Sequence, residues 1–68
     1  MNIVRIAQES HGWYWLCDVI FSDGYYDSPE AAATAAKLDP FIVRPFQLWY
    51  RLRDAQGQLV SIPGEIER

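Results

Sequence analysis

Alternation of apolar residues between positions 13 and 21 constrains the fold more than any other feature of the chain. All odd positions of this segment are apolar, whereas the even positions are mixed and include Asp18. The odd positions are Trp13, Trp15, Cys17, Val19 and Phe21. Because successive side chains of a strand point to opposite faces, this period of two predicts a strand with one face on the core. The Asp23-Gly24 pair predicts a tight turn, after which residues 25–27 are expected to pair back as a short third strand.

Three other segments carry strand patterns. Residues 2–8 are rich in β-branched side chains and lead into the polar residues 9–12, which predict a hairpin with the following strand. Alternation returns in residues 46–53, with Phe46, Leu48, Tyr50 and Leu52 on one face and Gln47, Trp49, Arg51 and Arg53 on the other. Residues 54–57 predict a turn and residues 58–62 a last strand, which Pro63-Gly64 is expected to end.

A helix is predicted to begin at Pro29. Ser28 can cap the free N–H groups of the first turn, Pro29 suits the first helical position, and Glu30 favours the positive end of the helix dipole. The following residues are mostly alanine, which has the highest helix propensity and lets a helix lie close on a sheet. Leu38 is the only large apolar residue of the helix and is expected to anchor it on the sheet. Pro40 disfavours helical geometry at Asp39, so the helix is expected to end at Asp39.

The order of these elements is β-β-β-α-β-β. It predicts an α+β fold, an antiparallel sheet of four to five strands with one helix packed on one face. Sixty-eight residues suffice for one domain only, which we expect to span residues 1–64, with residues 65–68 as a charged tail.

Charge and cysteine content narrow the class of protein. The net charge of −3 counts against a dedicated nucleic-acid binder, whose binding surface is usually basic. The single cysteine cannot form an internal disulfide, and the N-terminal residues lack the pattern of a signal peptide, so a cytoplasmic location is expected. Asp18 interrupts the strongest apolar run well short of the about 20 residues that a membrane-spanning helix requires, so no membrane association is expected.

Residues that could carry catalysis are few. A metal site needs three or four suitable ligands, and the chain has one histidine, His11, and one cysteine, Cys17, which falls on the predicted core face. The four glycines lie in separate turns and form no phosphate loop. Asp23, Asp27 and Glu30 each have a role in a turn or at the helix start. The sequence therefore predicts a protein without catalytic residues, metal or other cofactor.

One pattern resembles known small domains. It comprises Val4, the Gly12-Trp13 pair, residues 26–31 with the sequence Tyr-Asp-Ser-Pro-Glu-Ala, and Ala35-Ala36. It is similar to small uncharacterised bacterial and phage domains made of a hairpin and a helix, and more distantly to the arm-type DNA-binding domain of tyrosine integrases. In those domains a Gly-Trp pair opens a strand and a similar cap starts a helix on the sheet. The resemblance implies the fold, while the acidic balance departs from an integrase arm domain.

The candidate binding residues lie on the strand face that should point away from the helix. An exposed Trp49 between Arg51 and Arg53 matches the residue types enriched at the centres of protein interfaces. The same residues could stack a base and hold phosphates, or Trp49 could simply pack on Tyr14 or Leu16 under the arginine side chains. Tyr14 and Leu16 extend the surface with apolar area, because one short helix cannot cover both faces of the sheet.

These observations favour a small non-enzymatic interaction module whose macromolecular partner is a protein. Small acidic accessory or inhibitor proteins of phages or prophages match its size and charge. Two alternatives stay open. One is nucleic-acid binding through the face that holds Trp49, Arg51 and Arg53, and the other is a structural homodimer.

Overall fold

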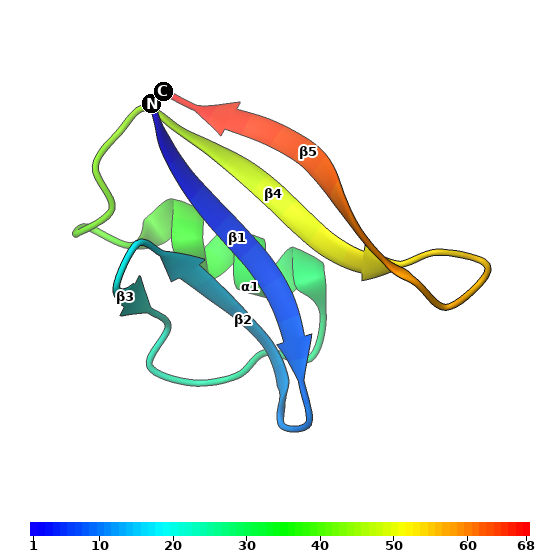
Figure 1. The fold of residues 1–68 in the computed structure, drawn as a ribbon. Helices are drawn as coiled ribbons and strands as arrows, with labels where there is room; N and C mark the ends of the chain where they lie inside the picture. The colour runs from blue at the N-terminus through cyan, green and yellow to red at the C-terminus, as the bar shows by residue number, and fades with distance from the viewer.

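Five strands form one sheet, and a single helix packs on one of its faces (Figure 1). The computed structural model describes residues 1–68. Its elements are β1 (Asn2–Glu9), β2 (Gly12–Cys17), β3 (Ile20–Phe21), α1 (Pro29–Leu38), β4 (Phe46–Arg53) and β5 (Leu59–Glu67). The strands lie in the order β3-β2-β1-β4-β5. The predicted α+β class is confirmed. The element order β-β-β-α-β-β is observed too, with residues 20–21 rather than 25–27 as the third strand.

The sheet is mixed, which corrects the expectation of an antiparallel one. β1 and β4 are parallel, with Val4 opposite Leu48, whereas the other three strand pairs are antiparallel. Parallel neighbours require a long crossover connection, usually a helix, and α1 lies in the connection that returns the chain to β4. Alternation along a strand shows which face is buried but carries no information on its neighbours, so the sequence left this pairing undetermined.

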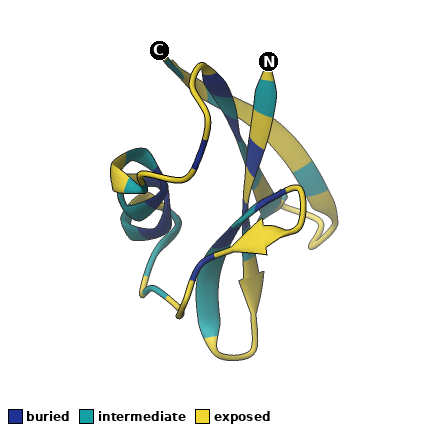
Figure 2. Ribbon diagram, turned by 90° about the vertical axis from the view of Figure 1, so that its left-hand side faces the viewer, coloured by how far each residue is buried: buried dark blue, intermediate teal, exposed yellow.

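The core lies between α1 and the sheet. Its fully buried large side chains are Val4, Ile6, Phe46 and Leu48, all from the two central strands. Trp15 and Cys17 extend the core along β2, and Ile42 closes one end. In Figure 2 the buried side of the helix faces the sheet. The face predicted for β4 is therefore confirmed, with Phe46 and Leu48 buried and Tyr50 and Leu52 half-buried.

The helix begins and ends where the sequence predicts. Ser28 accepts a hydrogen bond from the backbone N–H of Ala31 (3.0 Å), and α1 runs from Pro29 to Leu38. The prediction that Leu38 anchors the helix on the sheet is wrong, because Leu38 is 78% exposed. The contact with the sheet is made by Ala32, Ala33 and Ala36. At about 100° per residue, position 38 lies roughly opposite position 36 on the helix. Leu38 therefore points to solvent.

The segment 13–21 is two strands rather than one. Asp18 has φ 54° and turns the chain, so β2 ends at Cys17 and Val19 lies in the turn, 87% exposed. β3 then pairs back with Leu16 opposite Phe21, which places Phe21 on the face away from the helix. Apolar alternation does not reveal this turn, although aspartate is among the few residues that tolerate a positive φ.

The predicted third strand at residues 25–27 is reduced to one bridge. Tyr26 and Trp13 exchange two backbone hydrogen bonds, of 2.7 and 2.9 Å, and no strand forms around them. Gly12 is required beside this bridge, because a Cβ there would lie 2.8 Å from the carbonyl oxygen of Tyr26. Gly12 also has φ 131°, which side chains rarely permit.

The predicted charged tail is part of the sheet. β5 continues through Pro63 and Gly64 to Glu67, with an irregularity in its pairing opposite Gln47 and Trp49. Gly64 passes so close to the Tyr50 ring that a Cβ would lie 2.5 Å from it. The carboxylates of the last residues are held by cations, Glu65 by Lys37 and Glu67 by Arg44. Residues 65–67 therefore belong to the folded domain.

Ala36→Leu should lower the free energy of unfolding by about 1 to 3 kcal/mol, because the added side chain overpacks the contact between α1 and the sheet. Thr34→Leu places the same side chain on the exposed side of the helix and should change stability by less than about 0.5 kcal/mol. Urea unfolding of both variants measures the difference. Equal stability of the two would contradict the close packing of this helix face.

Candidate functional site

The sheet face opposite α1 is covered by no other element, and we call it the open face (Figure 2). Paired positions carry one row of side chains across all five strands. From edge to edge, the row is Phe21, Leu16, Arg5, Trp49 and Pro63. Paired residues of neighbouring strands share a face, so this row combines apolar, aromatic and cationic groups on one surface.

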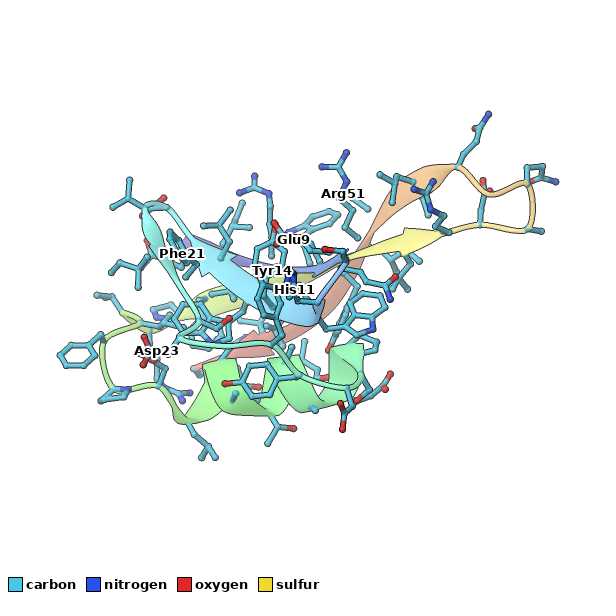
Figure 3. All side chains as sticks on the ribbon, turned by 90° about the horizontal axis from the view of Figure 1, so that it is seen from below. Glu9, His11, Tyr14, Phe21, Asp23 and Arg51 are labelled. Carbon is cyan, nitrogen blue, oxygen red and sulfur yellow. The ribbon has the colours of Figure 1, made fainter.

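All five predicted binding residues lie on the open face. Tyr14 and Leu16 belong to β2, while Trp49, Arg51 and Arg53 belong to β4. Arg51 and Arg53 are exposed, and the other three are half-buried. Figure 3 shows Arg51 pointing away from the helix. The structure therefore places these residues on one surface and leaves their role in binding to be tested.

β1 separates the two groups of predicted residues. Arg5 lies opposite Leu16 on one side and opposite Trp49 on the other, so Trp49 is two strands away from Leu16. The alternative in which Trp49 packs on Tyr14 or Leu16 would therefore require contacts across the intervening strand β1. Trp49 is on an inner strand, between β1 and β5, and lines a shallow hollow with Ile3, Arg5 and Ser61.

One hollow of the open face lies where two hairpins diverge. β1 and β4 are paired only as far as Ile6 and Tyr50, and beyond them the β1–β2 and β4–β5 hairpins separate (Figure 1). The hollow between them has a volume of about 300 Å³. Its lining residues are Arg5, Ala7, Gln8, Trp13, Tyr14, Leu16, Arg51, Arg53 and Leu59. We call it the fork hollow.

A second hollow continues the surface toward β3. It has a volume of about 380 Å³ and shares Tyr14 and Leu16 with the fork hollow. Its far end is formed by Phe21, Asp23 and neighbouring residues of the loop after β3. The two hollows therefore adjoin each other on the open face, with Tyr14 and Leu16 between them.

Positive charge is concentrated on the open face. Arg5, Arg51 and Arg53 are three of the six basic residues of the chain, and all three line the fork hollow. No carboxylate lines it. Arg53 donates from Nη1 to the carbonyl oxygen of Gly57 (2.6 Å), whereas the side chains of Arg5 and Arg51 take part in no hydrogen bond or ion pair of the structure. Two guanidinium groups therefore lack an internal partner.

Acidic and aromatic residues surround the second hollow beside the β1–β2 turn. The Tyr25 hydroxyl donates to the Glu9 carboxylate (2.6 Å), and the Tyr25 ring stacks on His11 at 5.3 Å and meets the edge of Tyr14 at 6.2 Å. The hydrogen bond to Glu9 raises the pKa of Tyr25, with smaller contributions from burial and nearby charge. Glu9, His11 and Tyr14 appear together in Figure 3. These contacts connect the hairpin turn to the loop after β3.

Arg5 is the residue of the site that the sequence analysis missed. It lies between Val4 and Ile6, which are both fully buried, so the period of two places it on the opposite face. The signal was therefore present in β1. Its position between the two predicted groups follows from the parallel pairing of β1 with β4, which local sequence does not show.

Other chemistry-bearing residues do not gather in this site. Cys17 is buried in the core, and burial, together with the nearby Asp18 charge, raises the pKa of its thiol. No group of three or more histidine, cysteine or acidic side chains is arranged to hold a metal ion. No helix has the length and apolarity needed to cross a membrane.

A second apolar surface lies at the β3 end of the molecule and shares Phe21 with the open face. Ile20, Phe21 and Phe41 line a common hollow there and are 47%, 63% and 76% exposed. We call it the end patch. Its hollow also contains Asp23 and Asp39 and has no basic residue, so its charge differs from that of the fork hollow.

Comparisons of the chain with protein-family models, with curated proteins and with solved structures found no match.

Two tyrosines should ionise late in an alkaline titration. The pKa of Tyr25 is raised by its bond to Glu9, and that of Tyr50 mainly by burial. Because the folded state favours both neutral phenols, their contribution to stability is present below about pH 10 and is lost as the pH rises through their folded pKa values. Ultraviolet absorbance of tyrosinate, compared in Tyr25→Phe and Tyr50→Phe, assigns the two late components.

Glu9→Gln should move the ionisation of Tyr25 to lower pH, since the carboxylate that accepts its hydroxyl is removed. Asp27→Asn, an exposed carboxylate without a hydrogen-bond partner in the structure, provides the control and should leave the titration unchanged. An unchanged Tyr25 component in Glu9→Gln would show that this hydrogen bond does not form.

Proposed function

We propose that the protein is a small non-enzymatic interaction module that binds a partner protein through its open face. The observation that carries this proposal is the continuous row of apolar, aromatic and arginine side chains over a face that no other element covers. Tryptophan, tyrosine and arginine are the residue types that contribute most at protein interfaces. The open face offers Tyr14 and three arginines around the fork hollow, and Trp49 in a neighbouring hollow that shares Arg5.

The small size of the domain supports a binding role. Only ten hydrophobic residues are buried, and they form one core on the helix side of the sheet. A chain of this length buries a smaller fraction of its surface than a larger domain does. A partner that covers Leu16, Phe21 and Trp49 would remove further apolar area from water, at about 25 cal/mol per Å². Association would therefore add stability that the isolated core does not supply.

The chemistry of the buried groups supports a protein without enzymatic activity. Nucleophilic cysteines are accessible thiolates with a lowered pKa, whereas Cys17 is buried with a raised one. His11, the only histidine, lies in a turn and bonds to its neighbour Ser10 (3.1 Å). The unpaired, buried thiol of Cys17 also fits a reducing compartment, which supports our proposal of a cytoplasmic location.

Trp49→Ala/Arg51→Ala should abolish partner binding, because it removes the aromatic residue and one of the unpartnered guanidinium groups of the open face. Wild-type protein is immobilised and incubated with nuclease-treated lysate. A captured protein is identified by mass spectrometry, purified and titrated against each variant by calorimetry. Phe41→Ser, which changes the end patch, provides the control and should bind as wild type does.

Trp49 is half-buried, so Arg51→Glu is a second variant that changes only an exposed side chain. It should weaken binding while the thermal unfolding transition stays that of the wild type. Undiminished binding by both variants would contradict the assignment of the open face. Loss of binding in Phe41→Ser, together with self-association in sedimentation, would favour the alternative of a structural homodimer through the end patch.

A further inference from the structure

We infer that the partner segment bound at the fork hollow is acidic and extended, with apolar side chains beside its carboxylates. This inference rests on the proposed function and specifies the chemistry of the partner. The hollow is lined by Arg5, Arg51 and Arg53 without any carboxylate, in a chain that has nine acidic residues and six basic ones. All the acidic residues therefore lie outside the hollow, which is the one place where three arginines meet.

The arginines of the hollow are available to a ligand. The side chains of Arg5 and Arg51 have no hydrogen bond or ion pair within the protein, and both residues are exposed. A planar guanidinium pairs with a carboxylate through two parallel hydrogen bonds, which are stronger than bonds between neutral groups. Carboxylates of a partner would therefore meet donors that nothing in the protein occupies.

The other walls of the hollow select for apolar groups. Tyr14 and Leu16 from β2 and Leu59 from β5 lie among the arginines. An anion alone would leave these side chains in contact with water, whereas a segment that alternates acidic and apolar residues would cover both kinds of surface. The combination fits a peptide better than an isolated anion.

The shape of the hollow favours an extended segment. Beyond Ile6 and Tyr50, β1 is paired only with β2, and β4 only with β5. The strand edges that face the fork have no strand partner there. A segment in extended conformation can hydrogen-bond to such an edge while its alternate side chains reach the hollow. An approaching helix would leave these edges unpaired.

Charge disfavours the two other occupants. A second copy placed face to face would bring its own three arginines against these three. A nucleic acid would extend beyond the fork hollow into the adjoining hollow, which Glu9 and Asp23 line, and would approach a protein of net charge −3. A short acidic segment of a partner protein meets the arginines without reaching those carboxylates.

Selection from short random peptides displayed on phage tests the inference. Peptides are selected on the wild-type protein, and fluorescent synthetic copies are titrated by anisotropy. Enriched peptides should combine aspartate or glutamate with apolar residues. Arg5→Gln/Arg51→Gln should bind them about tenfold more weakly or worse, since two charge-assisted contacts are removed. Arg68→Gln, an exposed arginine at the chain end, should bind them as wild type does.

The outcomes separate this inference from the proposed function. Peptides that lose binding in Trp49→Ala/Arg51→Ala but carry no acidic residue would overturn the acidic partner and leave the open face as the binding surface. Peptides that bind all variants equally would count against both. Absence of enrichment, or tighter binding of a single-stranded thymidine oligonucleotide than of any acidic peptide, would overturn the inference.

Discussion

The helix rests on the sheet through alanine side chains, and the arrangement of the other elements depends on this contact. Ala32, Ala33 and Ala36 are almost completely buried, so the helix backbone lies close to the strands. The volume of the core is then supplied from the sheet side, by residues such as Phe46 and Trp15. One ten-residue helix held this closely covers one face only. The open face is therefore a direct consequence of how the core is packed.

The side chains of the open face and of the helix side also differ in their free charge. The open face carries three arginines around one hollow, whereas the cations near the helix are already paired, Lys37 with Glu65 and Arg44 with Glu67. In the proposed binding role, the three arginines of the open face on a protein of net charge −3 would help to orient an approaching acidic partner. This arrangement would favour productive encounters at the open face before any close contact forms.

Local sequence chemistry predicted the elements better than their assembly. The cap at Ser28 and the alternation in β4 depend on near neighbours in the chain, and both are confirmed. The turn at Asp18 depends on one residue that tolerates a positive φ, and the apolar alternation of residues 13–21 does not indicate this turn. The extension of β5 depends on partners distant in sequence, since Lys37 and Arg44 hold its last carboxylates.

The candidate site could likewise be predicted only in part from the sequence. Trp49, Arg51 and Arg53 share a face because they alternate along one strand, and this much follows from the sequence. Their combination with Tyr14 and Leu16 around Arg5 requires β1 to lie between β2 and β4. That order is set by the crossover of the chain and by packing against α1, neither of which has a local signature.

The parallel pairing of β1 with β4 also bears on how the domain folds. The β1–β2 hairpin closes a short loop and can form early, whereas β4 can join β1 only after the chain has passed through β2, β3 and α1. The contact between the two central strands therefore carries the largest entropic cost of loop closure in the sheet. The surface on which Arg5 meets Trp49 depends on this contact, so we expect it to be absent from a chain in which β4 has not yet joined β1.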